Sequence, residues 1–429
     1  MTNRPRLTPP VADIRRAVRA ALASVARKSG DARGGTAVTS RPREGVAAHE
    51  ATQADPQRRP LHAASDALRV AGVSENAGVA PGAAEVTTPA DATGADTGPD
   101  TDAGAAEASG PLVLIALSGG PDSLALAAGT AFEAPRAGMR AGAVIIDHGL
   151  QDGSDEIAAR AAGQARELGL EPVMVVRVSV DETGDGPEAA ARVTRYEAIE
   201  ATRQQLGADA VLLGHTLDDQ AETVLLGLAR GSGGKSLHGM AAETGSLLRP
   251  LLGIRRADTL QACLDQGLEP WNDPHNDDPK YTRSRVRHAV LPMLERELGP
   301  GISEALARTA TTLREDSETL DDLAHEWARE VVSTDADGRI ALDVGGIVTQ
   351  PPALRQRICR IVAEQGFGVS LSRRHTMAVT ALATEYRGQG AIDLPGIRVE
   401  RERDQIFFGA TEAAAGDGGD DVVDAGATG

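Results

Sequence analysis

Residues 112–128 read Leu-Val-Leu-Ile-Ala-Leu-Ser-Gly-Gly-Pro-Asp-Ser-Leu-Ala-Leu-Ala-Ala. The apolar run at 112–117 predicts a buried strand, and the residues from 122 onward favour a helix. Between them, Gly119 and Gly120 permit a tight turn in which successive N–H groups point at one anion. The start of the helix adds further free N–H groups and the positive end of its dipole. This stretch therefore predicts a loop that binds a phosphate group at the end of a strand.

Asp122 is the residue of this loop that a simple phosphate site would not contain, because its carboxylate repels an anion. A Mg²⁺ ion between carboxylate and phosphates removes the conflict. The loop matches neither the P-loop nor the G-x-G-x-x-G turn. The alternative is an ordinary Gly-Gly turn capped by Asp and Ser. We expect a site for a metal-bound pyrophosphate, with Asp122 as metal ligand. The loop residues are Ser118, Gly119, Gly120, Pro121, Asp122 and Ser123.

The chain has 429 residues, which is enough for two or three domains. It contains no apolar stretch long enough to span a membrane and no uninterrupted apolar segment at its N-terminus. Cys263 and Cys359 form no Cys-x-x-Cys pair, so neither a zinc ribbon nor a cysteine-ligated cluster is encoded. We expect a cytoplasmic protein with reduced thiols and no membrane partner.

The net charge of −18 argues against a general nucleic-acid binder, since phosphate backbones require positive surface. Basic residues nevertheless cluster in one part of the chain, and a local basic patch is compatible with one specific RNA partner. Solvated helix faces with ion pairs are the alternative. The cluster contains Arg249, Arg255, Arg256, Lys280, Arg283, Arg285, Arg287 and Arg296.

The order of apolar runs predicts an α/β fold with a doubly wound, mostly parallel, Rossmann-like sheet, followed by a long connecting helix and a smaller α+β domain. Ligands of such sheets bind beyond the carboxyl ends of the strands. The loop at 118–123, Asp147 with His148, and Gly214 with His215 each follow a strand, so we expect them at one edge. Predicted strands lie at 112–117, 143–147, 173–180 and 210–213, and predicted helices at 122–134, 154–168 and 187–206.

Composition predicts the remaining organisation. Residues 9–27 carry a helical apolar face, whereas 29–109 contain too few large apolar residues to bury a core. We expect an N-terminal helix (1–28) that packs on the catalytic domain, a disordered insertion (29–109), the catalytic domain (110–300), a connecting helix (301–332), a small domain (333–409) and a disordered acidic tail (410–429). Within the small domain, helices are expected at 352–365 and 371–386 and strands at 339–344, 391–394, 397–401 and 405–408.

A second polar cluster begins where the strand at 210–213 ends. His215, Asp218, Asp219 and Glu222 are three, four and seven residues apart, which places them on one side of a helix starting near Thr216. Carboxylates on one face repel each other unless a cation such as Mg²⁺ or an ammonium group lies between them. A solvated, well-capped helix start is the alternative.

The helix at 187–206 carries a third polar group. Arg192, Arg195 and Tyr196 form one edge that is suited to phosphate or an RNA backbone. An exposed helix with Arg–Glu pairs, such as Glu188 with Arg192, is the alternative.

Taken together, the motifs resemble those of the tRNA(Ile)-lysidine synthetases, a family of the PP-loop ATP pyrophosphatase superfamily, and they occur in that family's order. The motifs are S-G-G-P-D-S, D-H-G-L, A-R-V-T-R-Y, H-T-L-D-D-Q-A-E-T, R-G-S-G, R-P-L-L, W-N-D-P-H-N and R-S-R-V-R-H-A-V-L-P. The resemblance implies an enzyme that uses ATP and Mg²⁺ to adenylate C2 of the wobble cytidine in the CAU anticodon of tRNA(Ile). Free L-lysine would then expel AMP to give lysidine, which changes the tRNA from AUG/Met to AUA/Ile specificity.

The resemblance also implies roles for single residues. His215, Asp219 and Glu222 match positions near the lysine and the cytosine, where a carboxylate pair binds the ammonium and helps to remove its proton. Arg192 matches an arginine that stabilises the leaving phosphate. Residues implied to lie near nucleotide or tRNA are Asp147, His148, Arg195, Arg249, Arg283, Arg285 and Arg287. We expect the domain at 333–409 to bind tRNA, and a homodimer is left open.

Three other functions compete with this one. A tRNA thiolase of the cytidine 2-thiolation type is the nearest, but it uses cysteine pairs that Cys263 and Cys359 do not supply. An amide synthetase of the NAD or GMP type fits poorly with R-S-R-V-R-H and the small domain. A non-catalytic binding module would not be expected to keep Asp122, Asp219 and Glu222.

Overall fold

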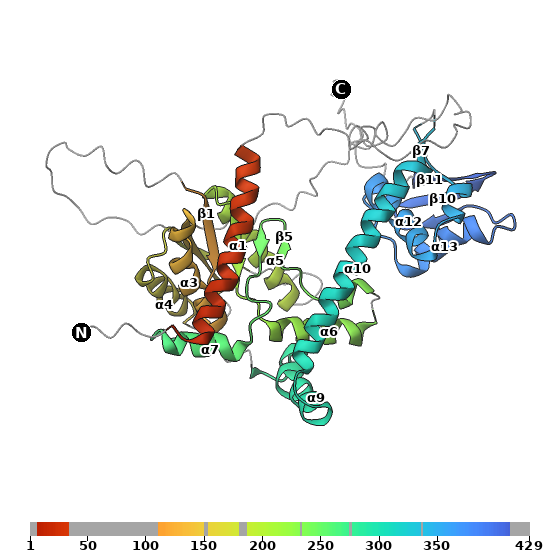
Figure 1. The fold of residues 1–429 in the computed structure, drawn as a ribbon. Coiled ribbons are helices and arrows are strands. Elements are labelled where there is room, and N and C mark those ends of the chain that lie inside the picture. The colour runs from red at the N-terminus through yellow and green to blue at the C-terminus, as the bar shows by residue number, and fades with distance from the viewer. Residues whose placement is uncertain are drawn as a thin grey trace, which may run out of the picture. The chain divides into compact units, whose positions relative to one another are not determined.

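The computed structural model describes residues 7–33, 110–149, 153–179, 187–231, 234–273, 277–335 and 338–411. They form two compact units (Figure 1). Among the described residues, the first unit comprises 7–33 and 110–313 and the second begins at 314. None of the described helices is both long enough and apolar enough to cross a membrane.

The first unit is built on a six-stranded sheet in the order β3-β2-β1-β4-β6-β5. All neighbouring strands are parallel except β5 and β6, which pair antiparallel. This confirms the predicted doubly wound, mostly parallel sheet. The short β5–β6 hairpin was not predicted, because two-residue strands leave no periodic pattern. The strands are β1 (Leu112–Ala116), β2 (Arg140–Asp147), β3 (Val173–Arg177), β4 (Ala210–Leu213), β5 (Glu243–Thr244) and β6 (Leu247–Leu248).

Helices cover both faces of this sheet, as the alternation along β1 shows. Val113 and Ile115 join the core beneath α1, α3, α4 and α7, whereas Leu112 and Leu114 join a second core that contains Ile199 of α5. The predicted helices at 122–134, 154–168 and 187–206 are confirmed within one residue at each end. The helices are α1 (Pro9–Arg33), α3 (Pro121–Glu133), α4 (Ser154–Glu167), α5 (Pro187–Gln205), α6 (Leu217–Arg230), α7 (Arg256–Asp265), α8 (Thr282–Arg285) and α9 (Leu291–Leu298), with short helical turns at η1 (Pro135–Ala137), η2 (Gly234–Leu237) and η4 (Val286–Val290).

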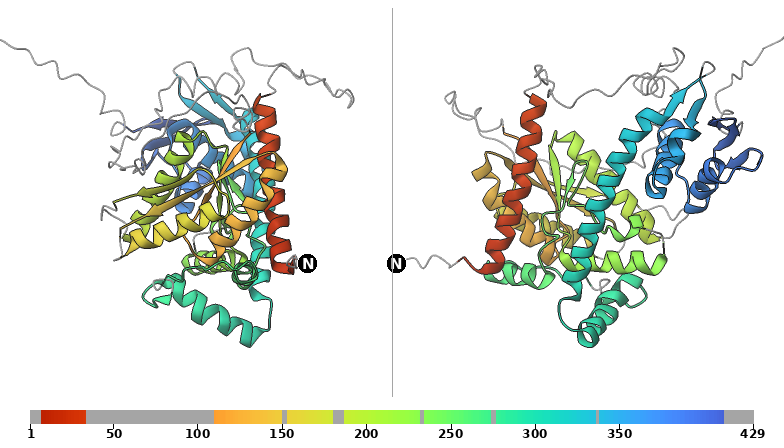
Figure 2. Two further views of the ribbon diagram at one scale, coloured as in Figure 1. Left: turned by 90° about the vertical axis from the view of Figure 1, so that its left-hand side faces the viewer. Right: turned by 45° about the vertical axis from the view of Figure 1, so that its right-hand side comes forward.

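The N-terminal helix α1 packs lengthwise on α3 and α7 (Figure 2). Val11, Ile14, Val18 and Leu22 of the predicted apolar face are buried in the core. The predicted end near residue 28 is wrong, since α1 continues to Arg33. Lys28 pairs with Glu243 and Ser29 bonds to Asp209, so contacts with distant residues extend the helix into the expected insertion. The rest of that insertion, 34–109, lies outside the described residues, as does the expected tail from 412.

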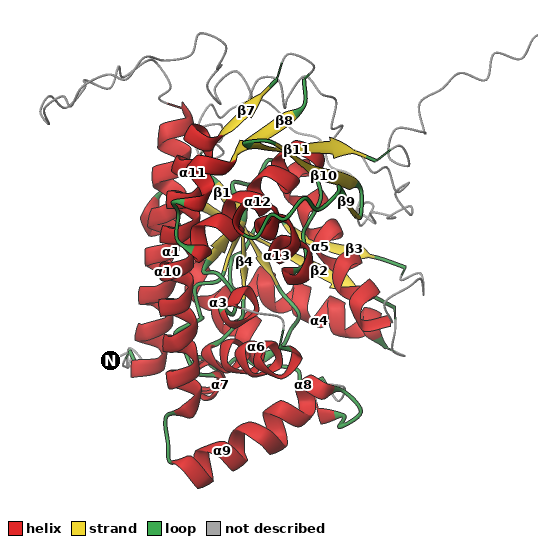
Figure 3. Cartoon of the chain, turned by 90° about the vertical axis from the view of Figure 1, so that its right-hand side faces the viewer, coloured by secondary structure: helices red, strands yellow, loops and turns green. Residues whose placement is uncertain are grey.

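The second unit carries an antiparallel five-stranded sheet in the order β7-β8-β11-β10-β9, covered by helices (Figure 3). The long helix predicted at 302–332 is confirmed as α10, and the predicted small α+β fold follows it. The elements are α10 (Ile302–Val331), whose first residues belong to the first unit, β7 (Val332–Thr334), β8 (Ile340–Asp343), α11 (Val344–Val348), α12 (Pro352–Phe367), α13 (Arg373–Thr384), β9 (Ile392–Leu394), β10 (Ile397–Glu402) and β11 (Gln405–Ala410).

Candidate active site

The phosphate-binding loop predicted at 118–123 joins β1 to α3 at the carboxyl end of the sheet. Gly119 has a φ of 82°, a left-handed conformation that glycine adopts without strain. The N–H of Trp271 donates to the carbonyl of Gly119 at 2.9 Å and holds the turn in place. No side chain caps the start of α3, where Gly120 is extended and Pro121 is the first helical residue. The first N–H groups of α3 are therefore available to an anion.

The two serines of this loop contact each other. Their Oγ atoms are 3.1 Å apart, and the hydroxyl of Ser123 donates to the carbonyl of Gly120 at 3.1 Å. The N–H of Ser118 also donates to Ser123 Oγ at 3.2 Å. This closed set of bonds shapes the loop without a ligand, and a phosphate oxygen would be an additional acceptor for the hydroxyl groups.

The end of β4 lies directly against the start of α3. A Cβ at Gly214 would lie 2.9 Å from the backbone nitrogen of Ser123, so only glycine fits here. Two residues later Thr216 caps α6, and Asp219 Oδ2 accepts bonds from the N–H and the hydroxyl of Thr216, each at 2.8 Å. The helix start predicted near Thr216 is thus confirmed, and its capping box orients the carboxylate of Asp219.

Three carboxylates from two helices meet three arginines beside this loop. Asp122 comes from α3, and Asp219 and Glu222 come from α6. Glu222 is fully buried, with Arg283 Nε and Arg287 Nε each 2.7 Å from its oxygens. Arg256 reaches all three carboxylates, and its Nη2 is 2.7 Å from Asp219 Oδ1. Arginines of the chain itself therefore supply the positive charge that neighbouring carboxylates require.

The helix from 282 onward selects which of its arginines enter this cluster. Arg283 and Arg287 are four residues apart and point to the carboxylates, where η4 forms a turn of π-helix. Arg285 points elsewhere, and its Nη1 donates to the carbonyls of Pro279 and Lys280 at 2.7 and 2.8 Å. The expected contacts of all three arginines with tRNA or nucleotide phosphates stay predictions.

Helix α7 supplies two site residues that were not predicted as such. The hydroxyl of Thr259 donates to Asp122 Oδ1, and Arg256 Nε lies 3.2 Å from Asp122 Oδ2. Arg256 belongs to the basic cluster of the sequence, but no local motif distinguishes it there from Arg255. Arg255 instead pairs with Asp218 and Glu304.

Burial and charge act differently on the carboxyl groups of the cluster. Burial raises the pKa of Asp122, although Arg256 and Thr259 act in the opposite direction. Burial also favours the protonated form of Asp219, but Arg256, Arg283 and the bonds from Thr216 outweigh it and lower the pKa of that carboxyl. Asp219 is thus held as an anion, whereas burial favours the protonated form of Asp122.

His215 lies between the carboxylates and a group of arginines. Burial lowers the pKa of His215 to about 4, with Asp219 opposing and Arg249, Arg283 and Arg192 adding to the effect. Its Nδ1 atom is buried without a hydrogen-bond partner among the described residues. His215 is therefore neutral at pH 7.

This histidine predicts a pH dependence of folding. An unfolded histidine with a pKa of about 6.5 binds a proton that folded His215 does not, so the free energy of unfolding decreases as pH falls from about 6.5 toward 4. Between pH 7 and pH 5 we expect His215 to account for a loss of about 2 kcal/mol. In urea titrations at both pH values, His215→Gln should lack this loss, and exposed His288→Gln should retain it. Equal pH dependence in His215→Gln and the wild type would contradict the neutral state of His215.

The remaining predicted residues surround this centre. Asp147 at the end of β2 accepts a bond from the N–H of Gly149 at 3.0 Å, and burial lowers the pKa of the neighbouring His148. On α5, Arg192 is exposed, whereas burial lowers the pKa of Arg195, and both guanidinium groups lie over the ring of Tyr196 at 5.3 and 5.6 Å.

The side chain of Arg249 forms hydrogen bonds with neighbouring residues through one of its nitrogens. Its Nη1 donates to the carbonyl of Ala241 at 2.9 Å and to the hydroxyl of Thr244 at 3.1 Å. Its Nε atom is buried and has no partner among the described residues. Together with Arg192 it forms a cationic margin around His215, as a polyanionic substrate requires.

The fit of Mg²⁺ to this site depends on the nucleotide. Within the described ranges, no group of three or more His, Cys, Asp or Glu side chains is arranged to hold a metal ion. Mg²⁺ commonly takes one or two carboxylates and completes its shell with substrate phosphates and water. Asp122 at the phosphate loop fits that arrangement.

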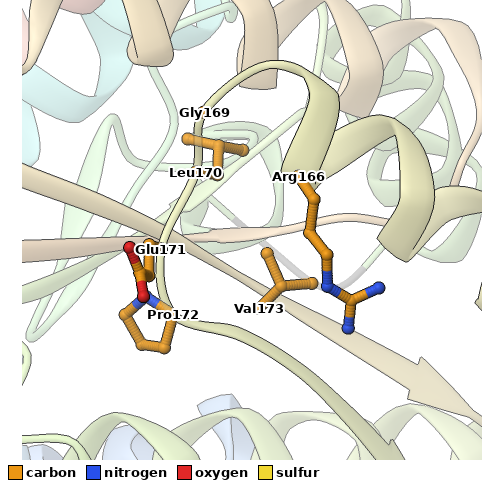
Figure 4. Close-up of a pocket in the computed structure, with 6 residues that line it drawn as sticks. All are labelled: Arg166, Gly169, Leu170, Glu171, Pro172 and Val173. Carbon is orange, nitrogen blue, oxygen red and sulfur yellow. The ribbon is translucent and has the colours of Figure 1, made fainter. Parts of the chain in front are cut away.

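A separate hollow of about 450 Å³ lies at the start of β3 (Figure 4). The strands of this sheet run parallel from there toward the phosphate loop, so the hollow is at the opposite edge. It contributes nothing to the site described above. Its lining residues are Arg166, Gly169, Leu170, Glu171, Pro172 and Val173.

Comparison with known proteins agrees with this geometry. Residues 102–294 match the PP-loop domain family, so the sheet and its loop define a PP-loop protein that uses ATP. A tRNA(Ile)-lysidine synthase of Leifsonia xyli is 63% identical over 301 residues, covering 70% of this chain and 90% of that protein. The synthases of Thermobifida fusca and Streptomyces coelicolor are 54% and 53% identical, covering 70% and 68% of this chain and 92% and 83% of theirs. The chain belongs to the tRNA(Ile)-lysidine synthase family.

One solved structure, the U34-tRNA thiolase NcsA from Methanococcus maripaludis, aligns with a TM-score of 0.42 and 22% identity, covering 48% of this chain and 73% of that one. A likeness of this degree does not bear on the function of the chain.

Proposed function

We propose that this chain ligates lysine to C2 of the wobble cytidine in the CAU anticodon of tRNA(Ile), converting ATP to AMP and pyrophosphate. The observation that carries this proposal is the 63% identity to a tRNA(Ile)-lysidine synthase over 90% of that relative's length. The product changes the tRNA from AUG/Met to AUA/Ile specificity. Lysine as substrate, Mg²⁺ as cofactor and a cytoplasmic location are parts of the same proposal.

In the first step, the C2 oxygen of the cytidine attacks the α-phosphorus of ATP, and the bond from that phosphorus to the pyrophosphate oxygen breaks. The uncapped N–H groups of α3 and the hydroxyls of Ser118 and Ser123 are proposed to bind the pyrophosphate. Asp122 would hold Mg²⁺, which supplies charge neutralisation on the phosphates when it is bound. Arg192 is proposed to stabilise charge on the transferred phosphate.

In the second step, the ε-amine of lysine attacks C2, the bond from C2 to the AMP oxygen breaks, and the amine loses a proton. Asp219 and Glu222 are proposed to bind the lysine ammonium, and neutral His215 offers Nδ1 as an acceptor beside them. Both carboxylates contact arginines. Lysine is therefore proposed to bind by replacing some of these contacts.

The cationic margin is proposed to hold the tRNA and nucleotide phosphates through charge-assisted hydrogen bonds. Arg195 is suited to this because its guanidinium group lies near those of Arg192 and Arg283 and contacts the ring of Tyr196. Asp147 and His148 are proposed to lie near the adenine or ribose. The group assigned to phosphates is Arg195, Arg249, Arg283, Arg285 and Arg287, and the domain at 333–409 is proposed to bind tRNA.

The direct test is incorporation of radiolabelled lysine into a tRNA(Ile) transcript with a CAU anticodon, in the presence of ATP and Mg²⁺. We expect incorporation that requires ATP and the wobble cytidine. A transcript with uridine at the wobble position is the matched control and should remain unlabelled. Cleavage of ATP to AMP without incorporation of lysine would contradict this substrate and keep only the PP-loop chemistry.

The charge of Asp122 has a separate consequence. We expect Asp122→Asn to slow tRNA-dependent release of pyrophosphate by at least about a hundredfold, because the asparagine amide cannot neutralise a cation on the phosphates. The fold should persist, since the asparagine oxygen can accept the bond from Arg256 and the asparagine NH2 group can donate to the hydroxyl oxygen of Thr259. Asp258→Asn, on α7 but outside the cluster, is the control in both the pyrophosphate assay and a thermal melt. Normal turnover in Asp122→Asn would show that Asp122 is not the metal ligand.

A thiolation reaction is less supported by the state of the cysteines. Burial raises the pKa of Cys263 to about 12 and that of Cys359 to about 11. Both are free and buried, and they belong to different units of the chain. Neither is therefore a reactive thiolate at pH 7, and they do not form the pair that such an enzyme uses.

A further inference from the structure

Arg256 is the first residue of α7, and its side chain reaches carboxylates of two other helices. Nε is 3.2 Å from Asp122 Oδ2, Nη2 is 2.7 Å from Asp219 Oδ1 and Nη1 is 3.3 Å from Glu222 Oε1. Its backbone N–H donates to Asp218 Oδ2 at 2.8 Å, which fixes the base of the side chain. A quarter of the side chain is exposed.

The three carboxylates depend on Arg256 to different degrees. Asp219 and Glu222 each also contact Arg283 and Arg287. For Asp122, by contrast, Arg256 is the one cation within ion-pair distance in the part of the chain that the structure describes. If Arg256 turns away, Asp219 and Glu222 keep counter-charges and Asp122 alone is left without one.

We propose that Arg256 is the resting counter-ion of Asp122 and gives up this carboxylate to a divalent cation when the nucleotide binds, turning toward the nucleotide phosphates. This inference rests on the proposed assignment of Mg²⁺ to Asp122. The exchange keeps the charges balanced, because Asp122 gains a cation as the guanidinium leaves and the guanidinium meets an incoming polyanion. An arginine fork is well suited to both partners, since carboxylate and phosphate oxygens have similar spacing.

The exchange gives the site one arrangement before the nucleotide binds and another afterwards. With Arg256 in place, Asp122 is engaged on both oxygens, by Arg256 and by Thr259, and is a poor ligand for a metal ion alone. The ion is therefore expected to bind together with the nucleotide, whose phosphates draw Arg256 away. The residue acts as a positioning group for the metal carboxylate before the nucleotide binds and as a phosphate contact afterwards.

Metal binding without nucleotide tests this role directly. Free Mn²⁺ is measured by its electron paramagnetic resonance signal, with Mn²⁺ as the probe for Mg²⁺ and without ATP, tRNA or lysine. We expect Arg256→Gln to bind Mn²⁺ at least about tenfold more tightly than the wild type, because a positive charge next to Asp122 is removed. Arg255→Gln is the matched control, since Arg255 is adjacent but pairs with Asp218 and Glu304, and its Mn²⁺ affinity should equal that of the wild type.

A second variant locates the bound ion. In Arg256→Gln combined with Asp122→Asn, the gain in Mn²⁺ affinity should disappear. Calorimetric titration with ATP and Mg²⁺ should show weaker nucleotide binding in Arg256→Gln than in the wild type, because a phosphate contact is lost.

Each other outcome overturns the proposal. Equal Mn²⁺ affinity in Arg256→Gln and the wild type excludes competition, and a gain that survives Asp122→Asn places the ion elsewhere. If Arg256→Gln does not fold, Arg256→Lys is used in its place. One ammonium group cannot contact three carboxylates at once, so lysine pairs with Asp122 less completely than arginine does. An intermediate affinity is then expected, and an affinity equal to that of the wild type overturns the proposal. Because the assay contains neither tRNA nor lysine, its result is separate from that of the lysine-transfer test.

Discussion

Glu222→Gln should lower lysine transfer by about 10²–10⁴-fold and the free energy of unfolding by about 3 kcal/mol. Glutamine has nearly the same shape, but it leaves Arg283 and Arg287 beside a neutral group in a place where Glu222 has no exposed surface. Asp219 alone then faces both arginines, and partly buried positive charge in excess of its carboxylates is costly. The loss of the anion also removes one of the two groups proposed to bind the lysine ammonium.

Urea denaturation and single-turnover lysine transfer measure the two effects separately. The control is Glu297→Gln, because Glu297 forms an exposed pair with Arg296 and should contribute at most about 1 kcal/mol. Activity equal to that of the wild type in Glu222→Gln would exclude a catalytic or binding role for this carboxylate. Lost stability with retained activity would assign it to structure alone.

Gly214→Ala should reduce ATP use by about 10²-fold and destabilise the chain by about 1–3 kcal/mol. The added Cβ would lie 2.9 Å from the backbone nitrogen of Ser123 and 3.0 Å from the carbonyl carbon of Asp122. Backbone atoms cannot rotate aside as a side chain does, so the start of α3 must shift. That shift moves the N–H groups and the carboxylate that are proposed to bind the metal-bound pyrophosphate.

The matched control for this variant is Gly163→Ala on α4, where an added Cβ would have no other atom within 4 Å. Alanine favours a helix over glycine by roughly 1 kcal/mol, so this control should melt at the same or a higher temperature with unchanged activity. Pyrophosphate release from ATP in the presence of tRNA reports the functional effect, and a thermal melt reports the structural one. Similar activity of the two variants would show that the β4–α3 approach does not position the loop.

The electrostatic arrangement reconciles an acidic chain with an anionic substrate. The net charge is −18, but the three carboxylates beside the phosphate loop are balanced by three arginines. Arg192, Arg195 and Arg249 surround this balanced centre. The site can therefore attract phosphates locally, since screening in salt limits the effect of the distant acidic surface to about a Debye length of 10 Å.

Much of the fold could be predicted because its signals are local. Adjacent glycines after an apolar run specify the turn at 118–123, and Thr216 with Asp219 specifies the start of α6. Periodicity located α3, α4, α5 and α10, whose apolar faces repeat along the chain. The end of α1 and the β5–β6 hairpin were missed, because Lys28 and Ser29 are held by residues of distant elements and two-residue strands have no period.

The phosphate loop and the row of acidic residues on α6 could be predicted from local sequence, since both depend on neighbours within one turn or one helix. The cations that contact those acids are set by the packing of distant helices. Arg256 lies 134 positions from Asp122, and Arg287 lies 65 from Glu222, and nothing in their local sequence separates them from Arg255 or Arg285. Their selection follows from where α7 and α8 dock at the sheet edge, because a buried carboxylate takes whichever guanidinium the packing of helices brings within hydrogen-bond distance.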